Sequence, residues 1–348
     1  MSGRPAAPCR HLLIVAPSWV GDATMATPAF RAIAAAWPDA RRTLLCRPGI
    51  DAVLDGLPAF TDRIVEAAAG TLGPLRAARR LRTLGADVAI LFPNSFRTAL
   101  MVRLSGVPRR IGYARDARGI LLTERVAMPR ERPRSTVDFY CNLVERGLGV
   151  AVPDRRPRLV ATEGDGMAAR TLLDALDGPF ALLVPGGNNP AKRWPVERFA
   201  SVAEALRERH GLTTLIAGSP GERALIESIR AACRVPTTSL AERPLGLGAL
   251  KAIVERAAIV ITNDTGPRHF AAAFGRPTVA LFGPTDHRWT RLPGVPERIV
   301  VAEPFLPEEL VADDRPAFCA IDRISVGDVM AHAAELLSAT APSAHPAA

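Results

Sequence analysis

Short, continuous apolar runs alternate with stretches of helical character along the chain, and this alternation constrains the fold more than any other feature. HLLIVAP (11–17), RTLLCRP (42–48) and DVAILFP (87–93) are each followed by a segment with the apolar spacing of a helix. Strands that are apolar on both faces are typical of a parallel sheet with helices on both sides. The first part of the chain is therefore predicted to be a doubly wound α/β domain.

The alternation stops in an Arg- and Pro-rich stretch (126–160) that holds one expected helix (135–147), and then it restarts. The later apolar runs are FALLVPGG (180–187), LTTLIAGSP (212–220) and AAIVITND (257–264). We predict two α/β domains of ordinary size, residues 1–160 and 161–348. After a stretch expected to be irregular (290–324), a final helix (325–338) is expected to pack back on the first domain.

The composition favours anionic partners. Hydrophobic residues make up 48% of the 348 residues, enough for a sizeable core in each domain. The formal net charge of +9 favours nucleotide phosphates, acidic glycolipids, a membrane surface or nucleic acid, and an ordinary solvated basic surface is the alternative. No nucleic acid is expected, because aromatic side chains are only 5% of the chain and are not interleaved with the arginines.

Cysteine usage and hydropathy predict a cytoplasmic protein. The five cysteines lie far apart in the sequence and form no metal-binding pair, as is typical of a reducing compartment. No apolar run reaches the ~18 residues of a membrane span, and the first run is shorter than the apolar region of a signal peptide. Any membrane contact is expected to be peripheral and to depend on positive charge.

Asp22 follows the first apolar run, in PSWVGDATMATPAF, where a helix is expected to begin. Two roles are open to it. Asp is a preferred helix N-cap, so the carboxylate can accept hydrogen bonds from free backbone amides. Ligands of open α/β sheets bind outside the carboxyl ends of the strands, so the same carboxylate can act as a general base.

Two loops of the second half carry residues suited to a nucleotide. In PGGNNPAKRWP, Lys192 and Arg193 can place positive charge on phosphates, and a solvated basic loop is the alternative. In AGSPGE, Glu222 can hold a ribose, or it can cap the helix that follows.

The segment TNDTGPRHFAAAFG predicts a phosphate site. Asp264, Thr265 and Gly266 form a turn between an apolar run and a helix. The free amides of the first helical turn, beside Arg268 and His269, suit an anion. A structural histidine and a capping aspartate are the alternatives for His269 and Asp264.

No metal is expected. The chain contains no Asp-x-Asp pair of the kind that holds a divalent ion on a sugar diphosphate, so basic residues and a helix N-terminus are expected to stabilise the leaving group. No Gly-x-Gly-x-x-Gly follows the first run, which argues against a dinucleotide enzyme. Two basic runs, PRRIGYARDARG with Arg110 and PRERPR (129–134), can meet an acidic acceptor.

Four motifs in this order resemble those of the lipopolysaccharide heptosyltransferases, which are family 9 glycosyltransferases: PSWVGDATMATPAFRAI, FPNSFRTALMVRLSGVPRRIGY, PAKRWP and TNDTGPRHFAAAFGRPTVALFGPTD. The similarity runs from Leu12 to Leu337, and SWVGD and PNSF look more like the type II enzymes than type I. It implies an α/β GT-B fold, with two Rossmann-like domains facing across a cleft. The first would bind the acceptor and the second the nucleotide sugar.

The resemblance also implies a reaction. The donor would be ADP-L-glycero-D-manno-heptose, and the acceptor an anionic heptosyl-Kdo2-lipid A inner core at the cytoplasmic face of the inner membrane. Transfer would invert the anomeric centre without a covalent sugar–enzyme intermediate and would need no cofactor.

Residue by residue, the resemblance assigns Asp22 as general base and Arg97 as an acceptor-facing residue. The donor-binding residues would be Lys192, Glu222, Asp264, Thr265, Gly266 and His269. Two other functions remain open: a relative with another nucleotide-sugar donor or glycolipid acceptor, and a nucleotide-binding protein without catalysis.

Overall fold

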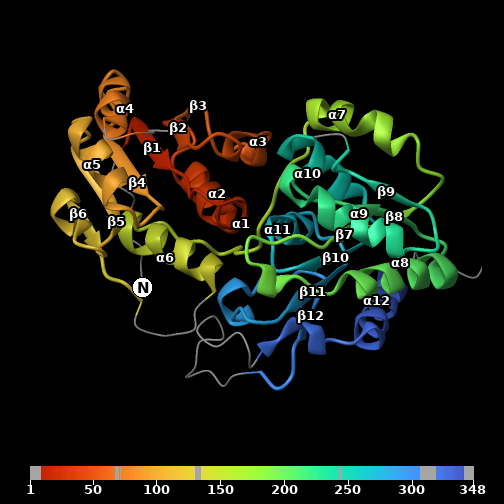
Figure 1. Ribbon diagram of the computed structural model, residues 1–348. Helices are drawn as coiled ribbons and strands as arrows, with labels where there is room; N and C mark the ends of the chain where they lie inside the picture. The colour runs from red at the N-terminus through yellow and green to blue at the C-terminus, as the bar shows by residue number, and fades with distance from the viewer. Residues whose placement is uncertain are drawn as a thin grey trace, which may run out of the picture. The chain divides into compact units, whose positions relative to one another are not determined.

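The structure, a computed structural model, describes residues 9–66, 70, 72–129, 135–242, 245–305 and 319–340. The chain forms two compact units (Figure 1), which we describe separately. Unit 1 contains Met1–Val160 with Trp289–Pro293, and unit 2 contains Ala161–Arg288 with Gly294–Ala348. The basic run PRERPR lies, apart from its first residue, outside the described residues.

Unit 1 is an alternation of strands and helices. Its elements are β1 (His11–Val15), α1 (Val20–Met25), α2 (Thr27–Ala36), β2 (Arg41–Cys46), α3 (Ile50–Leu54), β3 (Asp62–Val65), α4 (Gly73–Arg82), β4 (Val88–Leu91), α5 (Phe96–Leu104), β5 (Arg109–Tyr113), η1 (Arg118–Leu121), β6 (Glu124–Val126) and α6 (Thr136–Leu148).

Unit 2 repeats the alternation. Its elements are α7 (Glu163–Leu173), β7 (Phe180–Val184), η2 (Pro190–Lys192), α8 (Val196–His210), β8 (Thr213–Ile216), η3 (Pro220–Glu222), α9 (Arg223–Ala232), β9 (Thr237–Ser239), α10 (Leu247–Arg256), β10 (Ile259–Asn263), α11 (Gly266–Ala273), β11 (Thr278–Phe282), β12 (Glu297–Val301), η7 (Ile321–Arg323) and α12 (Val326–Thr340). The short helix η4 (His287–Thr290) begins in unit 2 and ends in the segment assigned to unit 1.

Both units contain a six-stranded sheet with one topology. The strand orders are β3-β2-β1-β4-β5-β6 and β12-β11-β10-β7-β8-β9, and every pairing is parallel. In each sheet the chain order reverses beside the first strand, between β1 and β4 and between β7 and β10. Doubly wound sheets bind ligands at this switch point, outside the carboxyl ends of the strands. The predicted α/β class is confirmed, and the topology locates two places for a site.

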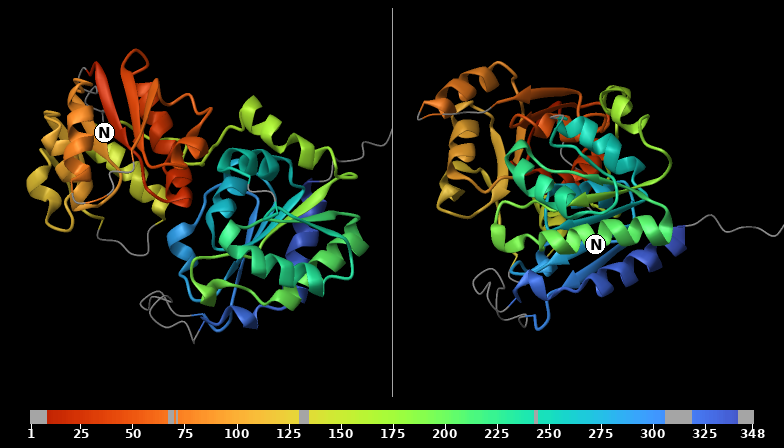
Figure 2. Two further views of the ribbon diagram at one scale, coloured as in Figure 1. Left: turned by 45° about the horizontal axis from the view of Figure 1, so that its top comes forward. Right: turned by 45° about the vertical axis from the view of Figure 1, so that its right-hand side comes forward.

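Helices cover both faces of each sheet (Figure 2). In unit 1, α4 packs beside α5, while α6 packs against α1 and α2. In unit 2, α7, α10 and α11 form one group and α8, α9 and α12 the other. The central strands β1, β4, β7 and β10 are buried along their whole length, which explains their unbroken apolar sequences.

Two local features differ from the sequence expectation. The segment after β1 forms two helices, α1 and α2, separated at Ala26 and followed by Pro28 in the first turn of α2. The stretch expected to be irregular contains β12, an edge strand of sequence ERIVV whose apolar run is only three residues long. The final helix, α12, packs against α8 and β11 of unit 2, and its packing on the first domain stays a prediction.

Candidate active site

Asp22 is not the N-cap of the helix in which it lies. Helix α1 begins at Val20, so Asp22 is its third residue, and the N-cap position is occupied by Trp19, which makes no side-chain capping bond. Trp19 is 67% exposed, so core packing does not explain it either. The Asp22 side chain accepts a hydrogen bond from Tyr140 of α6. The capping interpretation is therefore wrong, and the carboxylate is left for another role.

The surroundings of Asp22 suit a base. Burial raises the pKa of the Asp22 carboxyl, and the hydrogen bond from Tyr140 acts in the opposite direction. Among the described residues, no arginine, lysine or histidine forms an ion pair with it. A carboxylate that is partly desolvated and unpaired with a cation binds a proton more readily than an exposed one.

Tyr140 is fixed in place by aromatic neighbours. Its ring lies 5.6 Å from the ring of Phe92, which follows β4, and 5.6 Å from the ring of Phe139. Phe139 in turn stacks on Tyr113 at 4.3 Å, and the Tyr113 hydroxyl donates to the Phe139 carbonyl at 2.7 Å. Sequence reasoning missed Tyr140, because the sequence of a helix that is buried on most sides does not reveal which of its side chains contacts Asp22.

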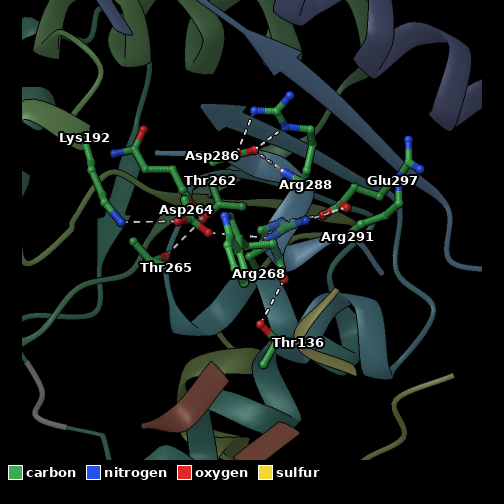
Figure 3. Close-up of polar contacts among 12 residues, drawn as sticks. Thr136, Lys192, Thr262, Asp264, Thr265, Arg268, Asp286, Arg288, Arg291 and Glu297 are labelled. Atoms are coloured by element: carbon green, nitrogen blue, oxygen red, sulfur yellow. Dashed lines mark hydrogen bonds and ion pairs between the residues drawn. The ribbon is translucent and has the colours of Figure 1, made fainter. Parts of the chain in front are cut away.

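The second group of charged residues lies in unit 2, at the switch point between β7 and β10 (Figure 3). One carboxylate oxygen of Asp264 is 3.3 Å from Lys192 Nζ, and the other is 3.6 Å from the guanidinium of Arg268. Arg268 is fully buried and forms two hydrogen bonds with Glu297, of 2.7 and 2.8 Å. The guanidinium also lies 4.9 Å from the centre of the Phe282 ring. Asp264 is thus held between a buried arginine and a lysine that is partly exposed.

The turn before α11 has the features of an anion site. Thr265 is the N-cap of α11 and makes no side-chain capping bond, so the first-turn amides have no side-chain acceptor there. His269 is buried, and its Nδ1 has no hydrogen-bond partner among the described residues. Burial, with a smaller contribution from the charge of Arg268, lowers the pKa of His269 to about 3. The imidazole is therefore neutral, and its unsatisfied Nδ1 does not fit the alternative of a structural histidine with satisfied hydrogen bonds.

The loop after β7 is tied to its neighbours by side chains. The Asn263 amide donates to the carbonyls of Pro185 and Gly186 at 2.7 and 3.2 Å. Arg193 donates twice to the Gly187 carbonyl, at 3.0 and 2.8 Å. Arg193 therefore shapes the loop, whereas Lys192 is the cation that reaches Asp264. A Cβ on Gly187 would lie 3.8 Å from atoms of both Lys192 and Thr265, so the loops after β7 and β10 converge.

Glu222 performs the structural role that the sequence left open. Its carboxylate accepts from the amides of Gly187 and Ser219, at 2.8 and 2.7 Å, and completes a capping box at η3. Burial acts to raise the pKa of Glu222, but these backbone hydrogen bonds, the Ser219 hydroxyl and the charge of Arg193 together hold it below its ordinary value. A Cβ on Gly186 would lie 2.1 Å from Oε1 of Glu222, so a larger residue there would push this carboxylate out of its present position. Ribose binding by Glu222 stays a prediction.

The two expected acceptor residues are not brought together. Arg97 lies in the first turn of α5, beyond the carboxyl end of β4, and donates to the Gly70 carbonyl. Arg110 lies in the amino-terminal half of β5, where its guanidinium donates to the carbonyls of Leu121, Val107 and Pro108. Arg110 therefore stabilises the end of the sheet opposite to Asp22, and we do not carry it into the proposed site.

Among the described residues, no three His, Cys, Asp or Glu side chains converge on a point where they could hold a metal ion. No helix in the described part of the chain is both long enough and apolar enough to cross a membrane. Metal independence itself stays a prediction.

The fold and the position of the site define a class of protein. A family 9 glycosyltransferase from Veillonella parvula has a TM-score of 0.82 and 21% identity, covering 95% of this chain and 98% of that one. The ADP-heptose lipopolysaccharide heptosyltransferase II of Escherichia coli has a TM-score of 0.79 and 24% identity, covering 94% and 99%. Both indicate the GT-B fold of two Rossmann-like domains.

The sequence comparisons give the family. The model of glycosyltransferase family 9 (heptosyltransferase) matches residues 75–308. Lipopolysaccharide heptosyltransferase 2 of Escherichia coli is 30% identical over 305 residues, which cover 80% of this chain and 84% of that protein. The chain belongs to glycosyltransferase family 9, and it is a glycosyltransferase.

Proposed function

We propose that this enzyme transfers L-glycero-D-manno-heptose from ADP-heptose to a heptosyl-Kdo2-lipid A inner core, with inversion at the anomeric carbon. The observation that carries the donor assignment is the turn before α11, where first-turn amides, Lys192 and neutral His269 meet at the switch point of unit 2. A diphosphate fits such a turn, because backbone amides and a nearby cation both stabilise negative charge. A related Escherichia coli heptosyltransferase was solved with ADP-2-deoxy-2-fluoro heptose, which supports an ADP-sugar as donor.

In the proposed reaction, the acceptor hydroxyl attacks the anomeric carbon as the bond from that carbon to the ADP oxygen breaks. Asp22 takes the hydroxyl proton, and ADP leaves with the electron pair of the broken bond. The amides of α11 and Lys192 stabilise the charge that develops on the departing diphosphate. Asp264 holds Lys192 at 3.3 Å before the donor arrives, so the cation is already oriented.

Glu222 and Thr265 complete the proposed donor site. Glu222 fixes the loops after β7 and β8 and would accept from a ribose hydroxyl through its remaining lone pairs. On the acceptor side we retain Arg97, which lies at the carboxyl edge of the unit 1 sheet, as Asp22 does. Support for a type II acceptor comes from the relatives named heptosyltransferase 2, which are 30% and 29% identical to this chain.

The function is tested by incubating the enzyme with ADP-heptose and a deacylated heptosyl-Kdo2 acceptor. We expect release of ADP and one added heptose, with inverted configuration in the product by NMR. Parallel reactions with other nucleotide sugars and with an acceptor lacking the first heptose separate this specificity from that of other family members. Binding of ADP without transfer to any acceptor would favour a non-catalytic nucleotide-binding protein and contradict the proposal.

The role of Asp22 predicts a pH dependence. The base must be ionised to accept a proton, and burial raises its pKa, so kcat/KM should rise with pH through a value above that of an ordinary aspartate. Tyr140→Phe removes a hydrogen bond that stabilises the carboxylate, so the acid limb should move up by about one pH unit. The measurement is a pH profile of kcat/KM for both enzymes. An unmoved acid limb would show that the titrating group is not Asp22.

A further inference from the structure

Helix α4 is strongly basic and carries no acidic residue. Its sequence is GPLRAARRLR, and no Asp or Glu occurs anywhere from residue 67 to residue 86. All four arginines are exposed: Arg76, Arg79, Arg80 and Arg82. None of the four forms an ion pair with a carboxylate in the described part of the chain. A helix of this kind repels other cations and attracts an extended anionic surface.

The opposite side of α4 holds it on the sheet. Ala77 and Leu81 belong to the core cluster of unit 1, together with Leu13 and Leu91 of the central strands. This inner stripe is apolar and small, so α4 lies close to the sheet and its arginines necessarily point outward. The exposed arginines are therefore a fixed property of the fold and do not depend on a mobile segment.

Exposed apolar side chains lie at the start of the same helix. Leu72 and Leu75 are 59% and 45% exposed, and Phe96 at the start of α5 is 43% exposed. Arg97, the neighbour of Phe96, donates to the carbonyl of Gly70, which brings the beginnings of α4 and α5 together. Three of the seven large hydrophobic side chains that are exposed in the described residues thus gather at one place.

The ends of the two helices also meet. Arg82 donates to the Leu104 carbonyl at 2.9 Å, next to the exposed Arg103, and Figures 1 and 2 show α4 and α5 side by side. Helix α5 carries no acidic residue either. We call this surface the α4–α5 face; it consists of Leu72, Leu75, Arg76, Arg79, Arg80, Arg82, Phe96 and Arg103.

We propose that the α4–α5 face docks on the surface of an anionic phospholipid bilayer. Arginines beside exposed leucines and a phenylalanine are the composition of an interfacial helix, in which the cations meet lipid phosphates and the apolar side chains enter the boundary with the acyl chains. Nucleic acid would use the arginines but would leave the two leucines without a partner. The biological reason for docking rests on the proposed function, because a lipid-linked acceptor is presented at a bilayer, but the binding itself is measurable without any transfer reaction.

The test is vesicle flotation with the full chain. Vesicles of equal parts phosphatidylethanolamine and phosphatidylglycerol should bind it, and vesicles of phosphatidylcholine alone should not. The variant Arg76→Gln/Arg79→Gln/Arg80→Gln should lower the partition coefficient roughly 100-fold, because each arginine near an anionic surface contributes about a fivefold factor. Leu75→Ser should lower it about tenfold through lost apolar contact.

The matched control has the same change of charge in unit 2. Arg209→Gln/Arg223→Gln/Arg234→Gln replaces three exposed arginines outside the α4–α5 face and should retain vesicle binding within about threefold, since the long-range attraction is screened beyond roughly a Debye length. Turnover of the α4 variant with ADP-heptose and the deacylated acceptor should remain normal.

Equal loss of vesicle binding in the α4 variant and in the control would overturn the proposal, because net charge alone would then explain the binding. Normal vesicle binding by the α4 variant would also overturn it. Lost turnover on the deacylated acceptor would assign the face to the acceptor instead of the bilayer. Tighter binding to a duplex oligonucleotide than to vesicles, lost in the same variant, would assign it to nucleic acid. If the proposed transfer reaction fails for all acceptors, flotation still decides the docking proposal.

Discussion

Asp22→Ala should lower kcat roughly 10²–10⁴-fold, the usual contribution of a general base. The physical reason is that the reaction would lose its proton acceptor. Among the described carboxylates, Asp22 is the one that accepts a hydrogen bond from Tyr140 and follows the strand at the switch point of unit 1, so no other carboxylate there can replace it. Asp22→Asn, which keeps the size of the side chain, should lose a similar factor. Affinity for ADP should not change in either variant, since the proposed donor site is built from unit 2. Steady-state kinetics and calorimetric titration with ADP measure both quantities.

Asp51 provides the matched control for Asp22. It too lies in the first turn of a unit 1 helix that follows a strand, and its carboxylate accepts from the Gly49 amide at 2.8 Å. Asp51→Ala should leave kcat within about threefold of the unchanged enzyme, because a lost local hydrogen bond affects stability and not the proton transfer. Near-normal turnover of Asp22→Ala would remove Asp22 from the mechanism.

Lys192→Ala should differ from Asp22→Ala in its effect on the donor: ADP should bind more weakly, and turnover should also be slower.

The order of strands and helices could be predicted because the signal is local and repeated. Central strands such as β1 and β10 are buried on both faces, so most of their residues are apolar and the strand is visible as a continuous apolar run. The edge strand β12 was missed because two of its five residues are charged and only three consecutive apolar residues mark it. Local pattern therefore predicts the centre of each sheet better than its edges.

The positions of candidate residues could be predicted where a motif fixes both the strand end and the following helix. This held for Asp22 and for the turn from Asp264 to Gly266, which lie outside the carboxyl ends of β1 and β10. It did not hold for Arg110, because a run of arginines does not reveal at which end of a strand the side chains lie. Deciding whether Asp22 caps the helix or acts as a base required knowing that the helix begins at Val20. Sequence patterns do not fix the first residue of a helix that closely.

Partners that come from distant segments were beyond the sequence. Tyr140 meets Asp22 only because α6 packs against α1, and Glu297 meets Arg268 only because β12 is the edge strand beside β11. Both contacts involve a residue that the sequence did identify. The sequence thus named Asp22 and Asp264 as candidates, whereas the hydrogen-bond and ion-pair partners of each carboxylate required the three-dimensional contacts.

Arg268→Met should destabilise unit 2 by roughly 3–5 kcal/mol, because it leaves the buried carboxylate of Glu297 without its cation. Glu297 has 6% side-chain exposure, and Arg268 none, so neither solvent nor another described cation can replace the pair. For a domain of this size the transition of unit 2 should fall by about 10 °C, measured by differential scanning calorimetry. Since Arg268 also holds one oxygen of Asp264, ADP binding should weaken in the same variant.

Arg298, the residue after Glu297 in the sequence, supplies the control for this prediction. Arg298 pairs with Glu335 at 3.2 Å on the surface, with both side chains about half exposed, so Arg298→Met should cost less than about 1 kcal/mol. The double variant Arg268→Met/Glu297→Gln should recover most of the lost stability, because it removes the buried charge together with its partner. Equal shifts for Arg268→Met and Arg298→Met would contradict the assignment of a buried, mutually dependent ion pair beneath the donor turn. A recovered transition without recovered ADP affinity would separate the two tasks of Arg268: it neutralises Glu297 for the fold, and it positions Asp264 for the site.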